Sequence, residues 1–155
     1  MKLNIKKLLI CLAIPLAVGG LSVLLSGGMG DYRQLNQPPL SPPGWLFPLV
    51  WTVLYLLMGY ASYRVLMSGK DESSIRDALR TYGAQLFLNF LWSIVFFRLE
   101  WPLVAFFVLI GLWILVYLTI RKFTALDETA GDLLIPYILW VTFAAYLNLG
   151  LILLN

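Results

Sequence analysis

The chain has 155 residues, of which 61% are hydrophobic and only 12% are charged, and its mean hydropathy is +0.85. This composition excludes an ordinary soluble domain, and the 15% share of aromatic residues excludes a disordered polar chain. The net charge of +3 comes from Lys and Arg residues scattered between apolar runs, so we expect no nucleic-acid partner.

Histidine is absent, and Cys11 is the only cysteine. The commonest general base and metal ligand is therefore missing, and no disulfide can form within the chain. We expect no metal site, and we expect Cys11 to behave as a small buried apolar residue.

Five stretches of the chain carry no charged residue, at 8–25, 43–63, 81–97, 101–120 and 133–154. A helix needs about 20 apolar residues to cross a bilayer, and each stretch approaches or reaches that length. Since the stretches lack the alternation of barrel strands, helices satisfy their backbone groups in lipid. The prediction is an all-α integral membrane bundle of five transmembrane helices in a single domain, 1–155. The helices are expected at about 6–27, 43–66, 77–98, 100–123 and 131–154, with a lid loop at about 28–42.

The basic residues predict the orientation of this bundle. Nine of the Lys and Arg residues fall on one side of the predicted membrane, and two, Arg33 and Arg98, fall on the other. Because basic residues concentrate in the cytoplasm, the N-terminus is expected there. No transit peptide is evident, so a bacterial cytoplasmic membrane is expected. The first apolar run also resembles a signal peptide, but it is long and no clean cleavage site follows, which favours a retained helix.

The loop at 28–42 lies on the side that is poor in charge. It contains Tyr32, and four prolines lie between residues 38 and 43, so it is rigid enough to act as a lid. Ser41 is expected to cap the second helix, and Asp132 is expected to cap the fifth.

Polar and aromatic residues inside the predicted spans follow helical spacing. No Asp, Glu, Lys or Arg lies in these spans, which disfavours an ion pump or a coupled carrier. The residues collect on one face of each of three helices: Gln85, Asn89, Trp92 and Phe96 on the third, Trp51, Tyr55, Met58 and Ser62 on the second, and Pro136, Trp140, Ala144 and Asn148 on the fifth.

Two interpretations of these faces stay open. In the first, the amides form hydrogen bonds between helices and the tryptophans anchor the helices at the membrane interfaces. In the second, the faces line a pocket for a flat, largely apolar ligand such as a tetrapyrrole or a sterol, which the indole rings contact and Asn89 orients.

Three blocks of the chain resemble the tryptophan-rich sensory protein or TspO/MBR family, which includes the mitochondrial translocator protein. The blocks are LNQPPLSPPGWLFPLVWTVLY at 35–55, QLFLNFLWSIVFF at 85–97 and IPYILWVTFAAYLN at 135–148, and the resemblance spans residues 30–150. It implies a five-helix bundle, often homodimeric, with a pocket that opens toward the first loop. The resemblance also implies that this pocket accepts porphyrins, sterols or synthetic drugs.

Carried over to this chain, the resemblance implies a set of ligand-binding residues, namely Tyr32, Trp51, Tyr55, Asn89, Trp92, Trp140, Ala144 and Leu147. It implies a membrane receptor or binding protein for porphyrins and related flat apolar ligands. Such a protein is a homodimer in contact with membrane lipid, and it requires no cofactor because the porphyrin is its ligand or substrate. Two alternatives stay open: transport or scavenging of tetrapyrroles, and light-dependent oxidative degradation of protoporphyrin. In the degradation reaction, Trp51 and Trp140 are the implied catalytic residues.

Overall fold

The computed structural model of the chain describes residues 3–26 and 36–155. Within these residues the chain forms helices and no strand, which confirms the predicted all-α fold class. The elements are α1 (Ile5–Ser26), α2 (Leu46–Leu66), α3 (Glu72–Ser93), the π-helical turn η2 (Ile94–Arg98), α4 (Pro102–Leu126), α5 (Glu128–Leu133) and α6 (Ile135–Leu154). Tyr32 and the first part of the predicted lid loop lie outside the described residues.

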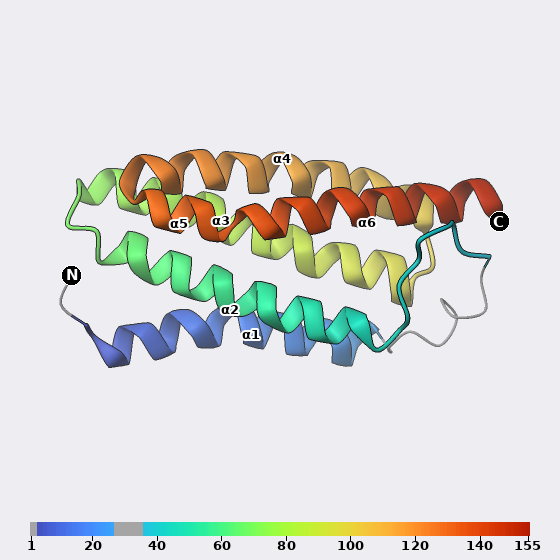
Figure 1. Cartoon of the computed structure of the whole chain (residues 1–155), viewed down its shortest axis with the longest axis horizontal. Coiled ribbons are helices and arrows are strands. Elements are labelled where there is room, and N and C mark those ends of the chain that lie inside the picture. Colours follow the sequence, from blue (N-terminus) through green and yellow to red (C-terminus); the bar gives the residue numbers. More distant parts are fainter. Residues whose placement is uncertain (1–2, 27–35) are drawn as a thin grey trace.

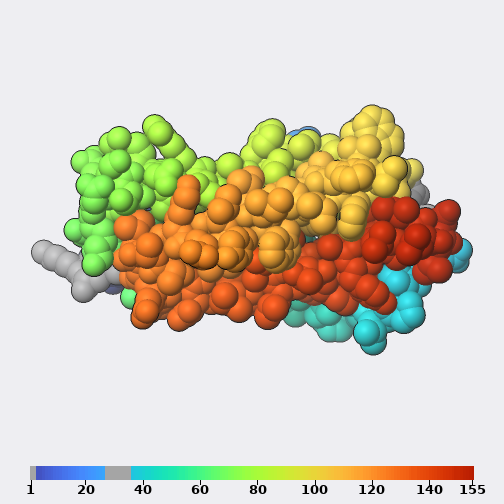
Figure 2. Space-filling view, turned by 90° about the horizontal axis from the view of Figure 1, so that it is seen from above, coloured from blue at the N-terminus to red at the C-terminus, as the bar shows by residue number. Residues whose placement is uncertain are grey.

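The helices run along one common axis, and the described chain ends lie at opposite ends of the bundle (Figure 1). α1 packs beside α2, α3 packs beside α4, and α4 also contacts α5 and α6. Figure 2 shows α4 and α6 side by side along the length of the molecule. α1, α2, α3 and η2 surround the main cavity described below, and α6 borders a smaller void beside it.

Four helical segments of the described chain are long and apolar enough to cross a membrane, so the protein is a multi-pass membrane protein. They are Ile5–Ser26, Leu46–Leu66, Pro102–Leu126 and Glu128–Leu154. α3 does not meet the same criterion, because its first turns carry Glu72, Arg76, Asp77 and Arg80.

Two helix caps differ from the sequence-based predictions. α2 begins at Leu46 and not at Ser41, whose hydroxyl donates to the Pro38 carbonyl at 2.7 Å and closes a turn inside the loop. Asp132 lies within α5, and the cap of that helix is Asp127, which accepts a hydrogen bond from the Ala130 N–H at 3.0 Å. Asp127 has the extended backbone of a cap residue, because the chain turns there between α4 and α5.

Glycines allow α1 to approach α2 closely. A Cβ atom on Gly59 would lie 2.7 Å from the Cys11 carbonyl oxygen and 2.8 Å from the Leu12 Cα. A Cβ atom on Gly19 would lie 2.4 Å from the Tyr55 ring. These contacts set the position of Tyr55 inside the bundle.

Ion pairs join the helices at the end of the bundle where α2 ends and α3 begins. Asp127 binds Arg64 of α2, with 3.1 Å between Oδ1 and Nε, while Lys122 of α4 binds Asp77 of α3, with 3.0 Å between Nζ and Oδ2. Burial alone raises the pKa of the Asp127 carboxyl, but hydrogen bonds from Arg64 and from the Ala130 N–H outweigh burial and lower this pKa below its usual value. This carboxylate therefore stabilises the fold at neutral pH.

We expect Asp127→Ala to lower the free energy of unfolding by about 1–2 kcal/mol, because both the helix cap and the partner of Arg64 are lost. Asp127→Asn keeps the cap and removes the charge, so it should cost less. The lowered pKa means that the ion-pair contribution is present above the unfolded-state pKa of about 4 and is lost as the pH falls through the folded-state pKa. Thermal unfolding in detergent over a pH series tests this prediction. The difference in stability between wild type and Asp127→Asn should shrink in acid, and a constant difference contradicts the prediction.

Candidate functional site

A cavity of about 360 Å³ lies between α1, α2, α3 and η2, near the end of the bundle where α2 begins. We call it the main cavity. Six of its lining residues come from α1, five from α2 and three from α3 and η2: Leu16, Gly19, Gly20, Ser22, Val23, Ser26, Phe47, Pro48, Trp51, Thr52, Tyr55, Trp92, Ser93 and Phe97. None of them is charged, so the main cavity suits an apolar ligand.

A smaller void adjoins the main cavity on the side of α6. It shares Phe47, Trp51, Trp92 and Phe97 with the main cavity. Its other lining residues are Phe96, Trp140, Ala144, Leu147 and Asn148. Aromatic rings therefore form the wall between the two spaces.

The structure gathers most of the predicted ligand-binding residues around these two spaces. Trp51, Tyr55 and Trp92 line the main cavity, and Trp140, Ala144 and Leu147 line the smaller void. Asn89 lies beneath the main cavity and contacts Tyr55.

The aromatic wall is built from edge-to-face and stacked contacts. The Trp51 ring stacks on Tyr55 at 5.6 Å between centroids and meets the Trp140 ring edge-on at 6.4 Å. The Trp92 ring stacks on Phe96 at 5.1 Å and meets Phe97 edge-on at 5.9 Å. Such pairs stabilise one another beyond simple burial, so the wall is rigid.

The π-helical turn η2 explains why two consecutive phenylalanines face the same space. In this turn the Leu99 N–H donates to the Ile94 carbonyl at 3.0 Å, five residues back, and the backbone is wider than an α-helix. Phe96 and Phe97 both line the smaller void as a result. The sequence predicts a continuous helix to residue 98 and does not reveal this turn, although π-turns are frequent at functional sites.

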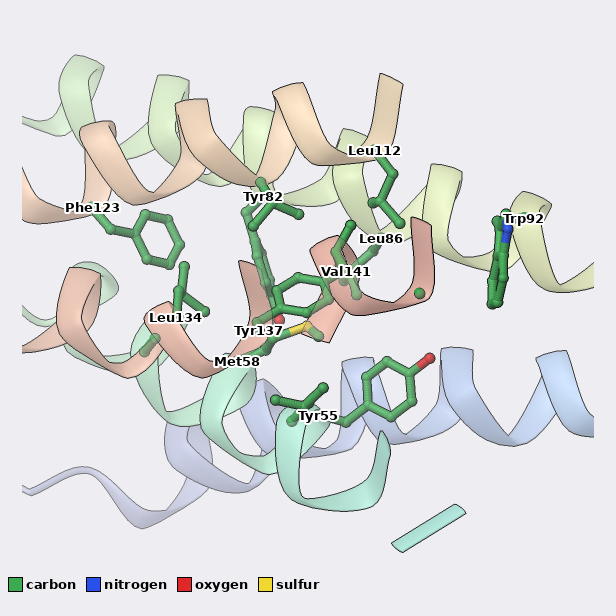
Figure 3. Packing of buried hydrophobic residues seen from close by; sticks show 14 of the residues in the cluster. Tyr55, Met58, Tyr82, Leu86, Trp92, Leu112, Phe123, Leu134, Tyr137 and Val141 are labelled. Atoms are coloured by element: carbon green, nitrogen blue, oxygen red, sulfur yellow. The ribbon is translucent and has the colours of Figure 1, made fainter. Parts of the chain in front are cut away.

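A chain of hydrogen bonds crosses the bundle below the aromatic wall. The Tyr55 hydroxyl donates to Asn89 Oδ1 at 2.8 Å, and Asn89 Nδ2 donates to the Tyr137 hydroxyl at 2.8 Å. The Tyr137 hydroxyl in turn donates to Gln85 Oε1 at 2.6 Å. Figure 3 shows Tyr55 and Tyr137 projecting from α2 and α6 into the bundle, with Trp92 further along its axis.

This chain supports the first interpretation of the polar faces, since the amides of Asn89 and Asn148 join helices. Asn148 accepts from Trp92 Nε1 at 3.1 Å and donates to the Pro102 carbonyl at 2.9 Å. Both amide atoms of Asn89 already form hydrogen bonds. Asn89 therefore affects the main cavity only indirectly, because it fixes the position of the Tyr55 hydroxyl.

Trp140 differs from these polar groups. Its Nε1 atom is buried and has no hydrogen-bond acceptor among the described residues, although its ring lines the smaller void. A buried donor without an acceptor is costly unless a ligand or water completes it. The geometry thus offers one buried donor without an acceptor among the described residues, at the edge of the smaller void.

Sequence reasoning missed two contributors to the site. Tyr137 shares the helical spacing of Val141, Ala144 and Asn148, so the stripe of α6 that includes Asn148 also includes Tyr137. The contribution of α1 has almost no signal in the sequence, because α1 places glycines, serines and aliphatic residues there, and only the pair Gly19–Gly20 hints at a close approach.

The family model of the TspO/MBR family matches residues 9–154. The chain belongs to this family. It is 37% identical to the tryptophan-rich protein TspO of Chlorobaculum tepidum over 100% of this chain and 99% of that protein. It is 39% identical to the TspO protein of Archaeoglobus fulgidus, over 99% of each chain. It is 33% identical to the translocator protein of Bos taurus, over 78% of this chain and 72% of that one.

Membership of the TspO/MBR family confirms the resemblance seen in the sequence, and it supports a membrane receptor or transporter role for this multi-pass protein.

We expect Tyr137→Phe to lower the free energy of unfolding by about 1–3 kcal/mol, because Asn89 Nδ2 and Gln85 Oε1 lose a partner inside the bundle. The matched control is Tyr117→Phe, whose hydroxyl accepts only from Arg121 at the surface. Thermal unfolding in detergent measures both variants. Equal losses for the two variants would contradict a structural role for the buried chain.

Proposed function

We propose that this protein is a membrane receptor that binds porphyrins and related flat apolar ligands in the main cavity. The observation that carries the proposal is a cavity whose described lining includes Trp51, Tyr55 and Trp92 and no charged residue, in a chain of the TspO/MBR family. Indole and phenol rings contact a flat ring system over a large area at little conformational cost. Trp140 Nε1 lies at the adjoining smaller void, so it would donate to an acceptor group on a ligand edge that reaches from the main cavity into this void.

The proposed membrane arrangement has five spans, with α3 and η2 as the fifth. Together they form one rod from Glu72 to Arg98 that lies beside α4 (Figure 1). The basic residues Arg64, Lys70, Arg76, Arg121 and Lys122 lie near the end of the bundle opposite the main cavity. The positive-inside rule then places the N-terminus in the cytoplasm of a bacterial cell and the main cavity near the outer side of the cytoplasmic membrane.

Exposed apolar side chains are available on the outside of the bundle. Phe87 of α3 and Phe107 of α4 are 63% and 66% exposed. These faces contact membrane lipid and, in the proposed homodimer, a second copy of the chain.

A titration in darkness with protoporphyrin tests binding. We expect saturable binding, which is measured as a shift of the porphyrin absorbance band. Trp51→Phe and Trp140→Phe should each weaken binding about three- to tenfold, since each removes aromatic contact worth about 0.5–1.5 kcal/mol. Trp113→Phe is the matched control, because Trp113 lies on the outer face of α4 and bonds Thr142. Absence of saturable binding in wild type would disprove the proposal.

A second function is favoured by the contact between Trp51, which lines the main cavity, and Trp140, which lines the adjoining smaller void; their ring centroids lie 6.4 Å apart. A light-excited porphyrin that accepts one electron from the Trp51 indole becomes a radical anion and leaves an indole radical cation. Trp140 can share this hole, and dioxygen takes the electron from the porphyrin to form superoxide. Oxidation of the ring by these products amounts to light-dependent degradation of protoporphyrin.

Illumination of the bound complex separates degradation from binding alone. We expect the porphyrin absorbance of wild type to decay faster under light than that of free porphyrin in the same detergent. Trp51→Phe should slow this decay at least tenfold when the ligand concentration is raised to restore full occupancy. If wild type and Trp51→Phe bleach at the same rate, the protein is a receptor and not an enzyme.

A further inference from the structure

We propose that the main cavity opens sideways to the bilayer between α1 and α2, and that flat apolar ligands dissolved in the membrane enter through this opening. The inference rests on the proposed function for its ligand class. It assigns a route of entry, and Gly20 is the residue that keeps this route open.

The exposed residues that line the main cavity mark the opening. Leu16, Gly20 and Val23 of α1 are exposed, and so are Pro48 and Thr52 of α2. Spacings of four, four and three residues place Leu12, Leu16, Gly20 and Val23 on one stripe of α1. Leu12 contacts α2 at Gly59, so this stripe follows the seam between the two helices.

The seam is sealed at one end and open at the other. Gly59 brings α2 against Cys11 and Leu12, and Gly19 brings α1 against the Tyr55 ring. A Cβ atom on Gly20 would meet no atom within 4 Å. Among the described residues, none fills the space beside Gly20, which lines the main cavity together with Trp51 and Thr52.

The opening lies at the depth of the hydrocarbon core. Gly20 is six residues before Ser26, the last residue of the candidate span, which corresponds to about 9 Å of helix. The exposed residues around it are apolar except for Thr52, whose hydroxyl donates to the Pro48 carbonyl at 2.7 Å. An apolar ligand therefore meets no polar barrier there.

On the opposite side of the bundle, the described part of the loop is fastened to α6. Asn36 and Asn155 exchange two hydrogen bonds, of 3.2 Å and 2.9 Å, and the Tyr146 hydroxyl donates to the Pro39 carbonyl at 2.6 Å. Pro38 packs on Gly150, where a Cβ atom would lie 2.5 Å from the proline ring. Figure 1 shows this segment crossing from the start of α2 to the end of α6. A ligand that entered over α6 would have to break these contacts.

The seam between α2 and α6 is closed by Trp140. The centroid of its ring lies 5.8 Å from that of Phe47 of α2, 6.4 Å from that of Trp51 and 5.5 Å from that of Phe143. An outer groove lined by Leu49, Val53 and Leu139 ends on Trp140. Beyond Tyr55, the seam between α1 and α2 is thus the route that no aromatic ring of the described residues blocks.

The test compares Gly20→Leu with Gly83→Leu in vesicles. Both glycines lie in helices and are exposed, and a Cβ atom added to either would have no neighbour within 4 Å among the described residues, so the two substitutions begin from matched surroundings. Only the leucine at position 20 fills the seam. A third variant, Tyr146→Phe, releases one of the loop contacts.

The first readout needs no porphyrin. A nitroxide-labelled fatty acid dissolved in the bilayer should quench the Trp51-dependent emission, which is obtained by subtracting the emission of Trp51→Phe. We expect Gly20→Leu to reduce this quenching at least twofold and Gly83→Leu to leave it unchanged. Equal quenching in both variants would overturn the lateral opening, whether or not porphyrin binds.

The second readout is the rate of protoporphyrin exchange with the same vesicles. Gly20→Leu should slow association about tenfold, equivalent to about 1.4 kcal/mol in the barrier to entry. Gly83→Leu and Tyr146→Phe should exchange at the wild-type rate. Faster exchange in Tyr146→Phe together with an unchanged rate in Gly20→Leu would place the route over α6. Lack of saturable porphyrin binding in wild type would instead refute the proposed ligand class, and the quenching result would still decide the opening.

Discussion

The buried hydrogen bonds between Tyr55, Asn89, Tyr137 and Gln85 constrain the rest of this structure. In a bundle that lies in lipid, polar side chains have no water to bind, so each must find its partner on another helix. The chain of bonds runs from α2 through α3 to α6 and then back to α3, and it fixes the rotation of each of these helices about its own axis. Once these rotations are set, the aromatic residues that lie one or two turns further along the same stripes must face the main cavity.

The polar chain also determines the chemistry of the main cavity. Because Asn89, Gln85 and Asn148 bond to other helices, none of their amides is left to bind a polar ligand. The wall therefore presents mainly aromatic rings, among them Trp51 and Trp92, and the adjoining smaller void contains the N–H of Trp140, which has no acceptor among the described residues. Such a site discriminates by shape and by contact area, and it holds one directed polar interaction in reserve.

The two ends of the bundle have different constructions, and this difference suits a binding protein in a membrane. At the end where the charges gather, ion pairs of Arg64 and Lys122 hold neighbouring helices together. At the other end the main cavity lies between α1 and α2, and a loop with three hydrogen bonds to α6 and the following Asn155 lies across the bundle. Rigidity at one end allows the other end to contain a cavity without loss of the fold, because the cost of the unfilled space is offset by contacts elsewhere.

The sequence by itself determined the helices, the membrane setting, the family and the faces that carry Trp51, Tyr55, Asn89, Trp92 and Trp140, because apolar length and helical spacing are local properties that lipid reinforces. Only the tertiary structure decided which groups meet. In the structure, Asn89 forms hydrogen bonds with Tyr55 and Tyr137. A π-turn places Phe96 and Phe97 in one wall, and Asp127 rather than Asp132 caps α5. The tertiary structure also made α1 a wall of the main cavity, with Gly20 beside a space that no described residue fills. The physical reason is that these features depend on contacts between residues far apart in the chain, and no local pattern of apolar residues or glycines specifies such contacts.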